Sequence, residues 1–350
     1  MEEWKEYKLG DVCSRLRSGK GIKADFIFNT GKYPVIGGNG VRGYADESNF
    51  EGQAAVIGRQ GAYCGNVRFF EGEAYMTEHA VVAVGNEHAD TRFLACLLSL
   101  MHLGNLSAQS AQPGISVQTL SKLLVRLPSI SYQKRVSAII KSIDDKIEVN
   151  RQINDNLEQQ AIAIFDKMFP AVALGENTIG SMITPKRGKG LLSKDAVEGN
   201  VPVVAGGLEP ATYHNESNTV APVVTISASG ANAGYVNLWH IPVWSSDSSF
   251  IDSSMTPNVY FWYVMLKKRQ KEIFDAQTGS AQPHIYPKHV AEMPLGIFEQ
   301  SDVAKFTEIV TPMFRIRGKN LKESERLVSV RDSLLPKLMS GELNLDKVNV

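Results

Sequence analysis

The sequence predicts an α+β protein in which two duplicated mixed α/β domains are separated by two long antiparallel coiled-coil helices and related by a pseudo-twofold axis. Two observations predict this architecture. The chain of 350 residues repeats itself at an offset of about 170 residues, and each copy ends in a long segment with a heptad pattern. The length is enough for two domains of ordinary size, each with its own core.

The repeat is clearest in one phrase that occurs twice, SAQPGI at 110–115 and SAQPHI at 280–285. The match extends in both directions and requires few gaps. Further matched pairs are SGKGI (18–22) with RGKGL (187–191), YPVIGG (33–38) with VPVVAGG (201–207), IGRQGAYCGNV (57–67) with ISASGANAGYV (226–236), and AYMTEHAVV (74–82) with VWSSDSSFI (243–251). Matches of this extent at a nearly constant offset indicate an internal duplication.

Each copy has two parts that differ in composition. The first part is rich in Gly, Ser, Asn, Pro and short β-branched runs, which predicts short strands and tight turns, with a helix at 91–103 in the first copy. The second part is a single long helix. We therefore expect a domain at 1–130, a helix at 131–169, a second domain at 170–299 and a second helix at 300–345.

No Gly or Pro occurs between Gln133 and Phe169, and residues of one face recur there in steps of four and three, as in a coiled coil. The first seam consists of Val136, Ile140, Ile143, Ile147, Asn150, Asn154, Leu157, Ala161, Ile164 and Met168. The second consists of Val310, Met313, Arg317, Asn320, Ser324, Leu327, Arg331, Leu334 and Leu338.

Both seams are apolar at their ends and polar in the middle. Antiparallel pairing of the two helices would set polar middle against polar middle and fix their register. A helix of about 36 residues is roughly 54 Å long, so the pair would hold the two domains well apart. The alternative is that each helix packs only on its own domain.

Composition limits the partners and the compartment. The chain has 37 Lys and Arg against 37 Asp and Glu, and this neutral balance counts against strong DNA binding by the isolated chain. Cys13, Cys64 and Cys96 form no CxxC pair or disulfide framework. MEEWKEYKLG lacks the apolar core of a signal peptide, and no apolar stretch is long enough to span a bilayer. We therefore expect a soluble, cytoplasmic protein.

The sequence lacks the common motifs that indicate an enzyme. It contains no phosphate-binding loop, no GxSxG, no HExxH, and no adjacent prolines such as a DNA amino-methyltransferase motif needs. The histidines and cysteines lack metal-ligand spacing, which predicts neither a metal nor another cofactor. Glu78-His79 resembles an acid–base pair, but Asp247-Ser248 replaces it in the second copy. A catalytic role is therefore not expected.

Two similar domains at a fixed separation suit a partner with two similar sites at a fixed separation, and duplex DNA is the commonest such partner. The chain also resembles the specificity subunit of type I restriction-modification systems. The resemblance rests on the opening WKEYKLGDV, the SAQPGI loop before a segment ending in LP (127–128), the helix starting near YQKRV, and the ending SLLPKLMSGEL (333–343). The order of these features, repeated twice, covers essentially the whole chain.

The resemblance implies a non-catalytic subunit of a DNA methylation and restriction complex. Domains 1–130 and 170–299 would be target-recognition domains, each reading one half of a bipartite site in double-stranded DNA. The helices would set the spacing and dock two methyltransferase subunits, through which motor-nuclease subunits join. The methyltransferase subunits can supply phosphate contacts, which is compatible with the neutral charge. The alternative is a duplicated adaptor on a coiled-coil spacer that binds a protein or a glycan.

Polar and basic residues on the Gly-rich turns are the candidates for contacts to DNA. Arg and Lys suit guanine edges or phosphates, whereas Asn and Gln suit adenine. In the first copy the candidates are Arg17, Lys20, Arg42, Arg59, Gln60, His79 and Gln112. In the second they are Lys186, Arg187, Lys189, His214, Ser227, Ser229, Asn232, Gln282 and His284. For each residue alone, the alternative is a solvated surface side chain.

The matched frame contains one pair of positions with different chemistry, Arg59-Gln60 opposite Ala228-Ser229. Such a difference would let one scaffold read two different half-sites. Gln112 and Gln282 are common to both SAQP loops, so we expect them to share a structural role or a contact to the DNA backbone.

Overall fold

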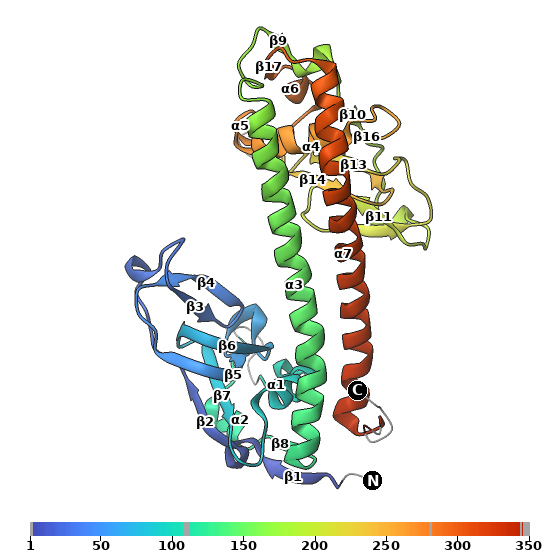
Figure 1. The fold of residues 1–350 in the computed structure, drawn as a ribbon. Helices are drawn as coiled ribbons and strands as arrows, with labels where there is room; N and C mark the ends of the chain where they lie inside the picture. The colour runs from blue at the N-terminus through green and yellow to red at the C-terminus, as the bar shows by residue number, and fades with distance from the viewer. Residues whose placement is uncertain (1–2, 108–112, 280–281, 344, 346–350) are drawn as a thin grey trace. The chain divides into compact units, whose positions relative to one another are not determined.

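The computed structural model describes residues 3–107, 113–279, 282–343 and 345. It divides into two compact units. Unit 1 contains Met1–Ile147 and Arg326–Val350, and unit 2 contains Glu148–Glu325. Two long helices, α3 (Ile130–Met168) and α7 (Gln300–Ser340), each contribute one segment to each unit (Figure 1). The predicted α+β content is confirmed.

Unit 1 is built on a six-stranded sheet with the order β2-β7-β5-β6-β3-β4, in which only β3 and β6 run parallel. Its strands are β2 (Cys13–Ser18), β3 (Tyr33–Gly37), β4 (Gly40–Ala45), β5 (Phe50–Gly58), β6 (Val67–Met76) and β7 (Ala80–Gly85). A separate antiparallel pair is formed by β1 (Lys5–Lys8) and β8 (Leu124–Leu127). The helices are α1 (Thr91–Leu100) and the short α2 (Val117–Ser121).

Helix α1 supplies the centre of the core of unit 1. Its Asp90 cap accepts a hydrogen bond from the Phe93 backbone N–H, and Phe93 and Leu98 are fully buried against the sheet. The helix ends at Leu100, earlier than the expected 103, because His102 adopts a left-handed conformation with φ of 48°. Ile140 of α3 and Leu338 of α7 belong to the same core, so these helix segments fold as part of unit 1.

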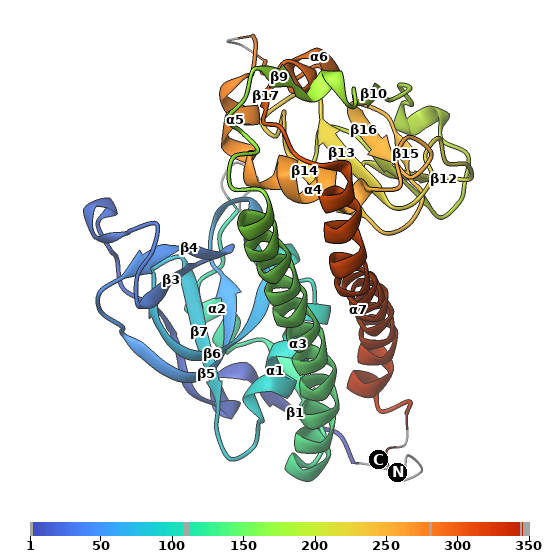
Figure 2. The ribbon, with the colours of Figure 1, turned by 45° about the horizontal axis from the view of Figure 1, so that its top comes forward.

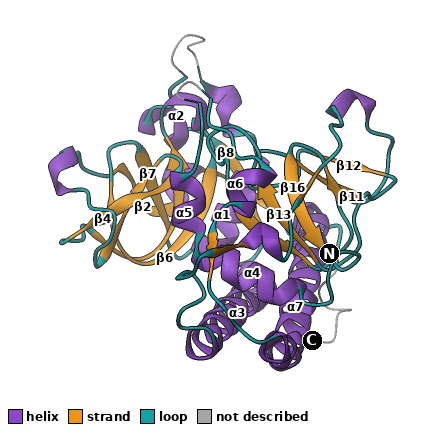
Figure 3. Cartoon of the chain, turned by 90° about the horizontal axis from the view of Figure 1, so that it is seen from above, coloured by secondary structure: helices purple, strands orange, loops and turns teal. Residues whose placement is uncertain are grey.

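Unit 2 contains a four-stranded sheet, β10-β16-β13-β14, a three-stranded sheet, β12-β11-β15, and the pair β17-β9. The strands are β9 (Asn177–Thr178), β10 (Lys186–Arg187), β11 (Val201–Val204), β12 (Thr212–His214), β13 (Val223–Ser227), β14 (Val236–Trp239), β15 (Trp244–Ser245), β16 (Ser248–Asp252) and β17 (Pro294–Leu295). The helices are α4 (Val259–Lys268), α5 (Gln270–Asp275) and α6 (Pro287–Ala291). In Figure 3, α4 lies between the sheet and the long helices.

The core of unit 2 is aromatic. Phe165 of α3 packs against Phe169, Phe261 and Phe306, with ring centroids 5.1–5.5 Å apart. Phe165 and Phe169 lie outside the predicted heptad seam. Phe165, near the end of α3, and Phe169, just after it, are buried because this part of the chain packs on α4 as well as on α7.

The predicted seam residues of both helices are all buried or half-buried. In unit 2, the side-chain amide of Asn320 donates to Asn154 (3.0 Å), and that of Asn150 donates to Ser324 (3.3 Å). The residue number rises along one helix as it falls along the other, so these segments run antiparallel (Figure 2). In unit 1, the hydroxyl of Tyr132 donates to the Leu338 carbonyl (3.1 Å).

No helix in the described part of the chain has the length and hydropathy needed to cross a membrane.

The two units differ from the expected domains because they include the helix segments. The expected domains end where the helices begin, whereas the boundaries of the units fall inside the helices, at 147/148 and 325/326. The reason is physical: each half of each helix buries its apolar residues in the core of one unit.

A half-buried imidazole in unit 2, that of His240, contacts a guanidinium. Arg317 donates to Nε2 of His240 (3.0 Å), and Gly318 allows this approach, since a Cβ there would lie 2.8 Å from the imidazole. Burial, and then the charge of Arg317, lowers the pKa of His240 from 6.5 to about 4. The folded state therefore binds fewer protons than the unfolded chain between these values.

We expect the contribution of His240 to stability to be complete above pH 6.5 and to be lost as the pH falls toward 4. The loss between pH 7.5 and pH 5 should be up to about 2 kcal/mol. Denaturant unfolding at the two pH values measures it. His240→Gln, which can still accept from Arg317 but does not titrate, should lose less stability over this range. An equal loss in the two proteins would contradict the assignment.

Candidate nucleic-acid interface

In each unit, a tight turn after a buried strand is held by the same backbone hydrogen bonds. In unit 1, Gly65 donates to the Gly58 carbonyl and Gly58 donates to the Asn66 carbonyl, both at 2.8 Å. In unit 2, Gly234 donates to Ser227 (2.7 Å) and Ser227 donates to Tyr235 (3.0 Å). Corresponding residues of the two turns, such as Gly58 and Ser227, are separated in the sequence by the offset of the repeat.

Glycines make these turns possible. Gly61 and Gly65 have φ of +76° and +83°, and Gly230 and Gly234 have φ of +80° and +89°. Glycine adopts this region at little cost, whereas other residues are strained there. The matched glycines of the two copies therefore serve the backbone of the turn.

The residues that follow each SAQ sequence close the turn. In unit 1, Gly61 donates to the Pro113 carbonyl (3.0 Å) and Ile115 donates to the Arg59 carbonyl (2.9 Å). The corresponding bonds in unit 2 join Gly230 to Pro283 (3.1 Å) and Ile285 to Ala228 (2.9 Å). The repeated phrase thus has a structural role in both units.

In unit 1, the turn also meets the end of the loop that precedes β7. The Arg59 N–H donates to the His79 carbonyl (2.9 Å), and Gln60 Oε1 lies 3.2 Å from His79 Nδ1. His79 Nε2 lies 3.3 Å from a carboxylate oxygen of Glu78. We call Gln60, Glu78 and His79 turn cluster 1.

Unit 2 places different side chains on the same frame. The Ala228 N–H donates to the Asp247 carbonyl (3.1 Å). The hydroxyl of Ser229 donates to one carboxylate oxygen of Asp247, and Nη2 of Arg187 donates to the other at 2.6 Å. We call Arg187, Ser229 and Asp247 turn cluster 2. Both clusters contain a carboxylate, but its partner changes from the imidazole of His79 to the guanidinium of Arg187.

Most predicted contact residues reach the surface. Exposed residues are Arg17, Lys20, Arg42, Gln60, Lys186, Arg187, Lys189 and Gln282, and half-buried residues are Arg59, His79, Ser229, Asn232 and His284. Gln112 lies outside the described residues. Arg17 and Arg42 lie on β2 and β4, the two opposite edge strands of the sheet, so the structure does not bring them together.

Two predicted contact residues are corrected by the structure. His214 is only 7% exposed, accepts a hydrogen bond from the Val197 N–H (3.0 Å), and packs edge-on against Trp244. Ser227 is 4% exposed and lies in β13, a central strand of its sheet. Both residues belong to strands rather than to open turns, so neither side chain is presented to a ligand.

Sequence reasoning missed Asp247 as a member of the site. It holds both polar neighbours of turn cluster 2, although its own chemistry is unsuited to contact with a phosphate. The sequence alignment of the two copies places Asp247 opposite Glu78, whereas the strand register places it opposite His79, because Gly58 pairs with Ala80 in unit 1 and Ser227 pairs with Ser248 in unit 2.

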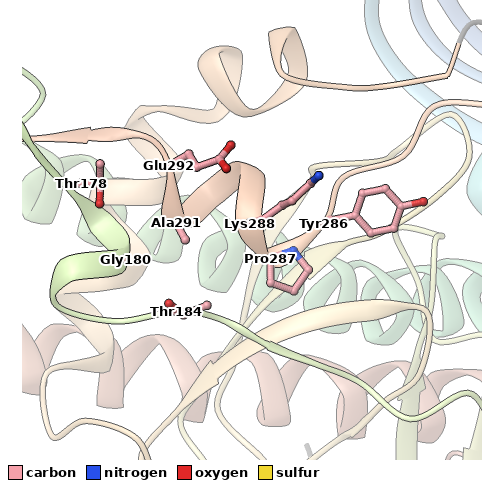
Figure 4. A pocket seen from close by; sticks show the side chains of 8 residues that line it. All are labelled: Thr178, Gly180, Thr184, Tyr286, Pro287, Lys288, Ala291 and Glu292. Atoms are coloured by element: carbon pink, nitrogen blue, oxygen red, sulfur yellow. The ribbon is translucent and has the colours of Figure 1, made fainter.

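A cavity of about 710 Å³ lies in unit 2. It is lined by Thr178, Gly180, Thr184, Tyr286, Pro287, Lys288, Ala291 and Glu292 (Figure 4). His284 contacts residues of both the cavity and turn cluster 2. Its backbone pairs with Ser229 of the cluster, and its ring stacks on Tyr286 of the cavity at an interplanar angle of 16°.

The two units thus share one loop framework and carry different polar side chains upon it. Residues 1–159 match the family described as the type I restriction modification DNA specificity domain. The match covers the first 159 of the 350 residues of the chain.

The relatives differ in how much of the chain they cover. The EcoprrI specificity subunit of Escherichia coli is 38% identical over 146 residues, which span 41% of this chain and only 36% of that relative. A putative type I specificity subunit of Mycoplasma pneumoniae is 23% identical over 96% of both chains. The solved structure of the S subunit from M. genitalium covers 96% of both chains with a TM-score of 0.62 and 21% identity, which shows a common fold.

Proposed function

We propose that this protein is the non-catalytic DNA-specificity subunit of a type I restriction-modification complex. Each domain reads one half of a bipartite site in double-stranded DNA. The helices pair as an antiparallel coiled coil, set the spacing of the half-sites, and dock two methyltransferase subunits that connect to the restriction subunits. The observation that carries this proposal is the shared turn framework with different side chains in turn clusters 1 and 2.

Different side chains on one frame suit a site with two different halves. The major groove presents a distinct donor and acceptor pattern for each base pair, and a guanidinium matches a different pattern from an amide. Turn cluster 1 offers the amide of Gln60 and the imidazole of His79, whereas turn cluster 2 offers the guanidinium of Arg187. The two domains therefore suit two unlike half-sites.

The neutral net charge fits a subunit that shares its DNA with partners. Neutralised phosphates supply much of the affinity of a protein for DNA. Methyltransferase subunits on the other side of the duplex would supply part of these contacts. An adaptor that binds protein or glycan is not supported by the relatives named above, which are all specificity subunits.

The test is to co-express this chain with its methyltransferase subunit and to map adenine methylation across the host genome. We expect a split motif that is methylated only when both proteins are present. Exchange of residues 1–130 for those of a homologue should change one half of the motif and leave the other. A stable complex that methylates no split motif would contradict the proposal, and the methyltransferase subunit alone is the control.

A further inference from the structure

Turn cluster 2 holds a guanidinium in a fixed place at the edge of a sheet. Arg187 ends β10, which is an edge strand, and Nη2 donates to Asp247 at 2.6 Å. Ser229 donates to the second oxygen of the same carboxylate. Asp247 is thus held from both sides, and it constrains the guanidinium in turn.

Stability does not explain this arrangement. The side chain of Arg187 is 42% exposed and that of Asp247 is 37% exposed. Ion pairs this exposed contribute about 0–1 kcal/mol, because water screens the charges and two long side chains lose freedom. The guanidinium has five N–H donors, and the bond to Asp247 uses one of them. The remaining donors are oriented before any ligand arrives.

We infer that Arg187, oriented by Asp247, is a specificity-determining residue that donates two hydrogen bonds to O6 and N7 of a guanine in the major groove. This inference rests on the proposed function and extends it. The half-site read by the second domain contains a G·C pair whose identity depends on this side chain. Arginine paired with these two acceptors is the geometry that distinguishes guanine from the other bases.

The two lysines near Arg187 in the sequence have a different role. Lys186 and Lys189 are exposed on either side of Arg187. Lysine is a flexible point charge without the planar fork of arginine, so it suits phosphates, which carry no sequence information. Lys189 is also held at its backbone, where Trp244 donates to its carbonyl (2.8 Å).

Unit 1 has no counterpart of this arginine. The repeat aligns Ser18 with Arg187, and the side chain beside the carboxylate of Glu78 is the imidazole of His79. The dependence on Arg187 should therefore be confined to one half-site.

The experiment maps adenine methylation in cells that express the methyltransferase subunit with wild-type chain, Arg187→Ala, Arg187→Lys, Asp247→Asn or Lys186→Ala. Arg187→Ala should lower discrimination against other bases about 5- to 150-fold at one guanine of one half-site. The other half-site should be unchanged. Asp247→Asn should weaken discrimination at the same guanine, although the guanidinium remains. Lys186→Ala should reduce methylation evenly over all sites, and Lys271→Ala, on the exposed face of α5, should have no effect.

The outcomes separate the inference from the proposal beneath it. A wild-type split motif that Arg187→Ala leaves intact, or weakens equally at every position, would overturn the inference and leave the proposed function standing. If the Arg187→Ala chain does not form the complex, the Arg187→Lys and Asp247→Asn variants still test whether recognition of the guanine depends on the oriented guanidinium. A wild-type complex without any split motif would overturn the proposed function and the inference with it.

Discussion

Replacement of Phe165 by alanine should lower the free energy of unfolding of unit 2 by about 3–5 kcal/mol. Phe165 is fully buried, and its ring packs against Phe169, Phe261 and Phe306. Removal of the ring loses the free energy that is gained when the ring is transferred from water to the core. It also leaves a cavity, because the aromatic neighbours cannot close around the empty space. The effect should therefore be among the largest of any single substitution in this unit.

Denaturant unfolding followed by tryptophan fluorescence measures this change, because Trp239, Trp244 and Trp262 all belong to unit 2. The matched control is Leu174→Ala, since this side chain is largely exposed in the same unit and should cost less than about 0.5 kcal/mol. Equal losses for the two variants would show that the end of α3 is not part of this core.

Replacement of Arg92 by alanine should destabilise unit 1 by about 2–4 kcal/mol. The guanidinium of Arg92 lies 3.3 Å from Glu71 and 3.4 Å from Asp144, and it covers the ring of Phe69 at 3.8 Å from the centroid. Its side chain is only 11% exposed. The cost stays below that of an isolated buried pair, because Arg331 of α7 still binds Asp144 at 3.0 Å.

Thermal unfolding of the full chain, with hydrogen exchange to locate the change in unit 1, measures the effect. Lys141→Ala removes a different ion pair, the exposed one with Asp145 on the same helix, and should cost less than about 0.5 kcal/mol. If Arg92→Ala costs no more than Lys141→Ala, α1 is not anchored to α3 and α7 through this charge network.

These two sites show how each unit connects its sheet to the long helices. In unit 1, Arg92 of α1 binds Asp144 of α3, which also binds Arg331 of α7. In unit 2, the hydroxyl of Tyr263 on α4 donates to Glu158 of α3. A helix packed under each sheet is thus tied to the long helices by polar contacts, which are directional and select one register from the many that apolar packing allows.

The sequence by itself determined the features that depend on local periodicity and on the comparison of the two copies. The seam residues of both helices, such as Ile140 and Asn154, are buried or half-buried as predicted, because a heptad repeat places them on one face of any helix. The glycines that match between the two copies could also be identified from the sequence. A turn position that requires positive φ favours glycine, so the residue type itself marks the position.

Only the tertiary structure decided which polar residues are available. His214 and Ser227 follow the same local patterns as true turn residues, and long-range packing buries them. Turn cluster 2 joins Arg187 to Asp247 across a separation of 60 residues, and Phe165 is buried by contacts with α4 and α7. Such contacts depend on where distant segments meet, which is set by the packing of the whole unit and is not encoded in any local period of the chain.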